Sequence, residues 1–379
     1  MRLARLRGLL ESRLRRLSLR MFGTTTIDEL GSVELLPSLE YSVTQFGMSQ
    51  LQQETYKYPV AVVTDVHESN GLIHGPFRFA TLPDAYLAGN GRVIDRKGRL
   101  VLDSVASHAQ KAGNPGWFRM RTARHMSGVY LNLNWWPGTG NFYHWNRDVL
   151  SRAFVLRSLP ESLTVNLVAP TELLQYQAHS LDRLSMMFPN SQVVKQPLDQ
   201  WWRVSEVLVP SQAPYLVGSG YLHPDVVDFV RDVNMVDTAT PSSVIPYLYV
   251  SRAKSRHRRI RDEDSLLRKL TERFPITVVH LEDLTVAEQL VLMKSAEVLI
   301  GPYGAGLTHV LFTKRKGLVE LHNGDSKETH FATLALGCRC PYEQVNGGPS
   351  DERQDFAMTE AGITRVVEAV QRVADRHRR

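Results

Sequence analysis

The chain has 379 residues, of which 43% are hydrophobic and 22% are charged, a composition that is typical of soluble globular domains and excludes a largely disordered protein. Two cysteines are too few for a disulfide framework, and no apolar run reaches the roughly 18 residues of a membrane span, so we expect a cytoplasmic protein. The formal net charge is +6, and residues 1–21 alone hold seven arginines against one glutamate. Because the remainder is balanced, we expect no nucleic-acid partner.

Residues 1–21 are predicted to form a basic amphipathic helix. Their apolar side chains recur at spacings of three and four, which would gather them on one helix face: Leu3, Leu6, Leu10, Leu14, Leu17 and Met21. This pattern favours binding to an anionic membrane surface, which would make the protein peripherally associated with the membrane. The alternatives are a helix docked on the protein itself or on a partner, and a mitochondrial targeting peptide.

Residues 22–240 are predicted to form an N-terminal domain in two parts. Residues 22–125 show little helical periodicity and many turn residues, which indicates an irregular β-rich region with a strand at 59–65. From 126 to 240, strands alternate with helices, the pattern of a Rossmann-like parallel sheet. The predicted strands are 129–134, 163–170 and 205–210, and the predicted helices are 171–187 and, with a glycine turn at its start, 138–159.

A second alternating block, residues 241–360, follows a connector near 238–246. Its predicted strands are 247–252, 276–281, 297–300 and 317–322, and its predicted helices are 262–274 and 285–296. A final helix over 361–379 carries an apolar stripe made of Ile363, Val366, Val367, Val370 and Val373. Two Rossmann-like halves facing one another would place a ligand in the cleft between them, at the carboxyl ends of the strands.

The stretch GPYGAGLTHVLF, residues 301–312, is a candidate phosphate-binding turn. Gly301, Gly304 and Gly306 follow a predicted strand, where backbone amides at a helix N-terminus could converge on an anion. Their spacing is neither the dinucleotide fingerprint nor a P-loop. A tight strand-to-helix turn with a purely structural role is the alternative.

Charged residues surround this turn in the predicted sheet. Arg252, Arg258 and Arg259 lie just past the first strand of the block, on the rim where a phosphorylated ligand would sit. A solvated basic loop is the alternative. Glu320, near the end of the strand GLVELH, could accept hydrogen bonds from ribose hydroxyls, or it could be a strand-end acid in water.

Together these motifs resemble glycosyltransferase family 61, which includes bacterial capsule and exopolysaccharide transferases and eukaryotic xylosyl- and N-acetylglucosaminyltransferases. The matching stretches are SR…RR…E, T-x-x-EQ, GAGLTHVLF and VEL, together with NFYHWNRDVL at residues 141–150. The resemblance implies a GT-B-like α/β architecture and an inverting, metal-independent transfer from a nucleotide-sugar, such as a UDP-sugar, to a glycan or lipid-linked glycan in surface polysaccharide biosynthesis. It assigns donor binding to residues 241–360, with no cofactor, through Arg252, Arg258, Arg259, Glu288, Gln289, Gly304, Ala305, Gly306, Leu307, Thr308, His309 and Glu320.

The sequence departs from the family pattern at two positions of the turn. Tyr303 stands where the family usually has histidine, and His309 stands where it has asparagine. Tyrosine keeps a hydroxyl but cannot become a cation near neutral pH, so the donor contacts differ, and a catalytically inactive nucleotide- or glycan-binding scaffold is one alternative. Another Rossmann-type nucleotide enzyme is a second. Asp262 and Asp264 suit the start of a helix better than a metal clamp.

An inverting transfer needs a base that takes the proton of the acceptor hydroxyl. His144 and Asp148 are four residues apart on the predicted helix and so share one face, which makes His144 the candidate base and Asp148 its orienting partner or replacement. A histidine that packs without proton transfer is the alternative. Asn141, Tyr143, Trp145 and Tyr303 are assigned to the acceptor side or the cleft, although aromatic residues of such a helix are more often core. Glu288 also fits a capping box with Thr285.

Overall fold

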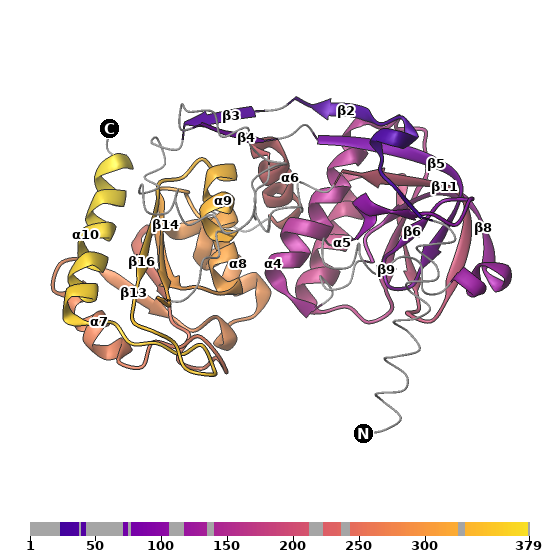
Figure 1. The fold of residues 1–379 in the computed structure, drawn as a ribbon. Helices are drawn as coiled ribbons and strands as arrows, with labels where there is room; N and C mark the ends of the chain where they lie inside the picture. The colour runs from indigo at the N-terminus through magenta and orange to yellow at the C-terminus, as the bar shows by residue number, and fades with distance from the viewer. Residues whose placement is uncertain are drawn as a thin grey trace, which may run out of the picture. The chain divides into compact units, whose positions relative to one another are not determined.

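The computed structural model describes residues 23–37, 39–42, 71–74, 77–105, 117–134, 140–211, 223–235, 243–324 and 330–377 (Figure 1). The predicted helix at 1–21 and the predicted strand at 59–65 lie outside these residues. By its internal contacts the chain divides into two compact units, the first comprising Met1–Ser38 and Gly75–Leu216 and the second Leu39–His74 and Val217–Arg379. The domain boundaries drawn from the sequence stay predictions.

The first unit is built on a nine-stranded sheet. Its strands follow the order β1 (Thr24–Thr25), β7 (Leu100–Val101), β6 (Val93–Ile94), β5 (Phe77–Ala88), β11 (Trp201–Pro210), β8 (Arg124–Asn132), β9 (Val165–Pro170) and β10 (Ser191–Gln196), with β2 (Val33–Leu36) on β5. The four strands β11, β8, β9 and β10 are mutually parallel, as expected of the Rossmann-like part. Because β11 also pairs with β5, the β-rich part continues the same sheet.

The helical segment after β8 changes its geometry twice. It begins as α4 (Phe142–His144), continues as a π-helix (η6, Trp145–Val149), and ends as a 3-10 helix (η7, Leu150–Ser158). The sequence predicts a single helix here, and the structure places three helical types within it. Among the described residues of this unit the other α-helix is α5 (Gln175–Met187), and short 3-10 turns lie at η1 (Asp28–Leu30), η3 (Leu102–Ser104) and η4 (Trp117–Thr122).

The second unit contains a five-stranded sheet in which every strand pair is parallel. Its order is β13 (Ile276–Val279), β12 (Ile245–Val250), β14 (Ala296–Pro302), β15 (Gly317–His322) and β16 (Tyr342–Asn346). A separate antiparallel pair, β3 (Leu39–Ser42) and β4 (Gly71–His74), belongs to the same unit. The helices are α6 (Pro224–Asn234), α7 (Glu263–Thr271), α8 (Val286–Ser295), α9 (His330–Gly337) and α10 (Glu360–His377), with 3-10 helices η9 (Leu281–Asp283) and η10 (Ala305–Phe312).

Helices cover both faces of this parallel sheet. Helices α7 and α10 lie on one face, and α8 and α9 lie on the other (Figure 1). The predicted stripe of α10 is confirmed, because Val366, Val370 and Val373 are fully buried against the sheet and the other two members pack at its margin. The protein is therefore a mixed α/β fold with one all-parallel, Rossmann-like sheet.

The strand order of the second unit defines where a ligand can bind. In chain order it reads 2-1-3-4-5, so the direction of winding reverses between β12 and β14. Open parallel sheets bind ligands at the carboxyl ends of their strands at this reversal. Arg252 follows β12 and Gly304 follows β14, so both candidate residues stand at the predicted position. Among the described residues no helix is both long and apolar enough to cross a bilayer.

Candidate active site

The glycine turn after β14 is tight because β12 lies directly beside it. A Cβ atom at Gly301 would be 2.8 Å from the backbone oxygen of Val250, closer than real side chains approach. At Gly304 the obstacle is a charged group, since a Cβ there would be 2.1 Å from Nη1 of Arg252. The missing side chain therefore makes room for the guanidinium of Arg252 at the start of η10.

Arg252 is a partly buried cation. Among the described residues, no carboxylate lies within ion-pair distance of it. Its Nη2 donates to Oγ of Ser255 at 2.8 Å and to the carbonyl of His257 at 2.9 Å, and both acceptors are neutral. Burial lowers the pKa of Arg252, and the neighbouring Arg258 lowers that pKa further. A positive charge held in this way favours an anionic ligand, which would relieve both effects.

Arg258 brings a second guanidinium to the turn. Its Cζ atom lies 4.6 Å from the ring centroid of Tyr303, which directly precedes Gly304, and its Nε donates to Oε1 of Gln354 at 2.7 Å. The backbone of Arg258 has a φ of 62°, in the left-handed region that arginine rarely adopts. Such conformations persist where the surroundings fix them, and they are concentrated at binding sites.

Arg259 differs from these two arginines because the protein already neutralises it. Its Nε and Nη2 donate to Oδ2 of Asp355 at 2.9 and 2.7 Å, and its backbone amide donates to Oδ1 at 2.8 Å. This geometry favours a structural role in fixing the loop. Its contact with a donor stays a prediction.

The first turn of η10 offers backbone amides beside the two arginines. Ala305 and Gly306 are partly exposed, and the first amides of a helix lack acceptors within it. Thr308 is fully buried, and its Oγ1 has no hydrogen-bond partner among the described residues. Leu307 is a core residue that packs under the turn.

His309 and Gln289 brace η10 against α8. Nδ1 of His309 lies 3.0 Å from the carbonyl of Gly306, and Nε2 lies 3.0 Å from Oε1 of Gln289. Burial lowers the pKa of His309 to about 4, so the ring is neutral near pH 7, and its single N–H donates to one of these two acceptor oxygens. The amide of Gln289 donates to the carbonyls of Leu281 and Leu284 at 2.8 and 3.1 Å. Through Gln289 and His309, η10 is therefore joined to α8 and to the residues before it.

Glu288 forms the capping box that its spacing from Thr285 predicts. Its Oε2 accepts from the Thr285 amide at 2.8 Å and from the Thr285 hydroxyl at 2.7 Å, while its own amide donates to that hydroxyl at 3.3 Å. These bonds, the Thr285 amide first, lower the pKa of the Glu288 carboxyl. The carboxylate therefore serves the start of α8, and its donor contact stays a prediction.

Tyr303 and Glu320 belong to a polar cluster above β15. The Tyr303 ring lies 4.5 Å from the ring of His322, and its hydroxyl is 3.0 Å from Nδ1 of His330. Glu320 is fully buried, accepts from the hydroxyl of Tyr342 at 2.6 Å, and has Oε1 3.6 Å from Nε2 of His322. Its predicted contact with a ribose is untested.

In the first unit, His144 and Asp148 form the pair that their spacing predicts. Nδ1 of His144 lies 2.7 Å from Oδ2 of Asp148, and the other carboxylate oxygen pairs with Nη1 of Arg147. Burial alone would raise the pKa of Asp148, but Arg147 and His144 outweigh it and hold that pKa below its usual range. An ionised Asp148 fixes Nδ1–H of His144 toward itself and makes Nε2 the basic nitrogen.

Local structure places this pair where a substrate could reach it. The side chain of His144 is 27% exposed, whereas that of Asp148 is 2% exposed. Asn141 caps the helix, its Oδ1 accepting from the amides of Tyr143 and His144. The following turn is the π-helical one, a geometry that recurs at functional sites.

The aromatic neighbours of His144 are mostly core. Trp145 is fully buried and donates through Nε1 to Oγ of Ser180 on α5 at 2.9 Å. Tyr143 is also buried, and its ring meets that of His144 edge-on at 5.2 Å. This favours the core interpretation for both residues over a sugar platform.

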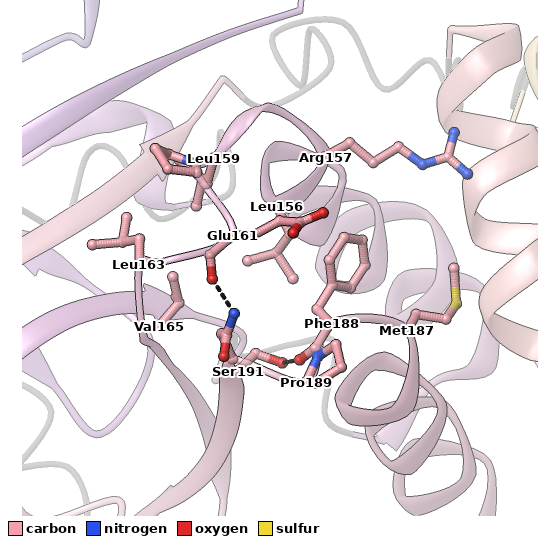
Figure 2. A pocket seen from close by; sticks show the side chains of 12 residues that line it. Leu156, Arg157, Leu159, Glu161, Leu163, Val165, Met187, Phe188, Pro189 and Ser191 are labelled. Carbon is pink, nitrogen blue, oxygen red and sulfur yellow. Dashed lines mark hydrogen bonds between the residues drawn. The ribbon is translucent and has the colours of Figure 1, made fainter.

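Two pockets in the described part of the first unit lie away from the His144–Asp148 pair. The larger, of about 510 Å³, is at the amino ends of β9 and β10, opposite to the ends where ligands of parallel sheets bind (Figure 2). The second, of about 430 Å³, lies between Asp84, His125 and Arg203. Neither contains a predicted site residue. Within the described parts of the chain, no group of three or more histidines, cysteines or acids could hold a metal ion.

The sequence did not point to several residues that complete these arrangements. Arg147 stands beside Asp148 in the motif NFYHWNRDVL, and this adjacency is the only signal that could have found it. Asp355, His322 and His330 belong to no recognised motif. Only the fold brings them to Arg259 and Tyr303.

Part of the chain that contains these residues is similar to known proteins. Residues 142–319 match the model of the family Glycosyltransferase 61, a segment that includes the His144 pair, both arginines and the glycine turn. The EGF domain-specific O-linked N-acetylglucosamine transferase of Drosophila melanogaster is similar, with 35% identity over 99 residues, which are 25% of this chain and 19% of that relative's length. Residues 142–319 are therefore similar to glycosyltransferase family 61, which supports the family resemblance of the motifs over that segment, and the chain spans only about a fifth of that relative's length.

Proposed function

We propose that this protein is an inverting glycosyltransferase of GT-B-like architecture that moves a sugar from a nucleotide-sugar to a glycan or lipid-linked glycan. The observation that carries the proposal is the extent of the family match, which spans both the His144–Asp148 pair and the arginine-flanked glycine turn. The second unit would bind the donor, and the histidine pair of the first unit would act on the acceptor.

The turn is suited to a diphosphate because it brings together two arginines that form no ion pair with a carboxylate among the described residues. Arg252 and Arg258 supply guanidinium groups near Gly304, and the first amides of η10, which begins at Ala305, supply neutral donors. In the transfer, negative charge grows on the departing nucleoside diphosphate. Arginines and helix-terminal amides can stabilise that charge, which is why we expect no metal requirement.

The bond changes follow from an inverting displacement. Nε2 of His144 accepts the proton of the acceptor hydroxyl as its oxygen forms a bond to the anomeric carbon of the donor sugar. The bond from that carbon to the phosphate oxygen breaks, and its electron pair leaves with the nucleoside diphosphate. The ionised Asp148 stabilises the imidazolium that forms at His144.

The donor sugar, the product and the cellular location are inferred from the relative and from the motifs. The relative in Drosophila melanogaster is named for N-acetylglucosamine transfer, so a UDP-linked N-acetylhexosamine is the first donor to test. The motifs' resemblance to capsule and exopolysaccharide transferases favours a surface polysaccharide as the product. Residues 1–21 would hold the enzyme peripherally on an anionic cytoplasmic membrane surface.

Nucleotide binding tests this function directly. Thermal unfolding and calorimetry would be recorded with UDP, GDP, CMP, TDP and NAD, each with EDTA and with Mn²⁺. A ligand at about 100 times its dissociation constant adds about 2.7 kcal/mol of stability. Stabilisation by one nucleoside diphosphate in EDTA is the expected result. Response to NAD alone, or only with Mn²⁺, would contradict the proposal, and binding without transfer would indicate the inactive scaffold that Tyr303 suggests.

A further inference from the structure

The Tyr303 side chain packs against several other side chains of the second unit. Its ring centroid is 4.6 Å from Cζ of Arg258, 4.5 Å from the ring of His322 and 5.5 Å from that of Phe331. Its hydroxyl lies 3.0 Å from Nδ1 of His330. Because these groups surround the ring, it is better placed to hold the Arg258 guanidinium than to stack on a sugar or a nucleobase.

The Arg258 guanidinium, which lies over the Tyr303 ring, must be held in place by contacts that leave it charged. Arg258 has a left-handed backbone, maintained by its amide donating to the carbonyl of Arg353 at 3.1 Å and by its Nε donating to Gln354. Arg252 lies close enough to repel it: burial first and then the charge of Arg258 lower the pKa of Arg252. An aromatic face attracts a guanidinium without neutralising it, whereas a carboxylate would cancel the charge that an anion needs.

We propose that Tyr303 is a positioning residue whose ring holds the Arg258 guanidinium beside the glycine turn for the donor's diphosphate. The bond from its hydroxyl to His330 is one of several contacts that hold the ring, so the ring keeps its place without that bond. The inference rests on the proposed function and specifies how the site recognises its anion. Tyrosine serves here because the ring remains uncharged at neutral pH and therefore does not repel the arginine.

The test is the affinity for nucleoside diphosphate in a set of variants. The probes are UDP, GDP and TDP with wild-type protein, and the one that binds most tightly is then used throughout, together with inorganic pyrophosphate. The variants are Tyr303→Phe, which keeps the ring, Tyr303→Leu, which removes it, Arg258→Gln, and the double variant Tyr303→Leu/Arg258→Gln. Unfolding curves establish that each variant is folded.

We expect Tyr303→Leu to weaken both probes by about three- to tenfold, the range of a partly desolvated cation–π contact, and Tyr303→Phe to stay within about twofold of wild type. The double variant should bind no more weakly than Arg258→Gln alone, because the ring acts through the arginine. In donor kinetics the loss should appear in kcat/KM and partly in kcat, because Arg258 also faces the charge that grows on the departing diphosphate.

The outcomes separate this inference from the proposed function. If wild type binds a nucleoside diphosphate and the losses of Tyr303→Leu and Arg258→Gln simply add, the positioning role is wrong while the function stands. A folded Tyr303→Leu variant with wild-type affinity would also overturn it. If the wild-type protein binds neither nucleoside diphosphates nor pyrophosphate, the donor site and the inference fall together.

Discussion

Substituting Gly304 by alanine would test whether the turn holds a phosphate. The φ and ψ of Gly304 are 165° and 169°, an extended conformation that alanine also adopts. The three atoms nearest to the added Cβ all belong to the Arg252 guanidinium, with Nη1 at 2.1 Å and Cζ at 2.7 Å. The arginine must therefore move while the backbone remains, and we expect the free energy of unfolding to stay within about 1 kcal/mol of wild type.

The expected effect is on the donor. A hydrogen bond to a charged group contributes about 1.5–3 kcal/mol, so displacing Arg252 should weaken nucleoside diphosphate binding by about 10- to 150-fold. Calorimetric titration of Gly304→Ala measures the loss. Arg252→Gln should give a similar loss, and the two changes together should cost little more than either alone.

A second glycine provides the matched control. A Cβ at Gly317 would be 1.8 Å from Cγ1 of Val373, which is fully buried between α10 and the sheet. Gly317→Ala should therefore lower the free energy of unfolding by about 1–3 kcal/mol while donor affinity in the folded protein is kept. Wild-type affinity in a folded Gly304→Ala variant would refute the assignment of Arg252 to the diphosphate.

Three further predictions concern other parts of the chain. His144→Ala should lower kcat by about 10²- to 10⁴-fold with donor affinity unchanged, and a near-normal turnover would exclude His144 as the base. Burial lowers the pKa of His309 from 6.5 to about 4 in the folded protein. As the pH falls, the unfolded chain therefore takes up this proton before the folded protein does, and the free energy of unfolding of wild type should drop by about 3 kcal/mol between pH 6.5 and pH 4. Denaturant titrations at several pH values should show that His309→Asn lacks this loss, and equal slopes would refute the buried neutral ring. Deletion of residues 1–21 should abolish binding to phosphatidylserine vesicles and leave transfer in solution intact, whereas persistent vesicle binding would contradict the membrane role of that segment.

Much of the fold was predictable because periodicity is local. The strands at 163–170 and 317–322 and the helix α8 appear where their patterns place them. The strand β10 was missed because its sequence, SQVVKQ, is mostly polar, and its register on β9 supplies the hydrogen bonds that its composition does not predict. The helix α9 was missed because it is apolar nearly all round and is fully covered by its neighbours.

The sequence by itself determined the alternation of strands and helices, and therefore the parallel sheet, the position of the glycine turn at a strand end and the spacing that pairs His144 with Asp148. Only the tertiary structure decided how the arginines differ. Arg259 forms an ion pair with Asp355, 96 positions later in the chain. Arg252 instead lies where a side chain at Gly304 would be, and Arg258 lies over the ring of Tyr303. The spacing of residues along the sequence predicts which of them share a face of one helix or strand. Whether a charged side chain is neutralised depends on which distant segment packs against it, and that packing is set only when the sheet and its connections assemble.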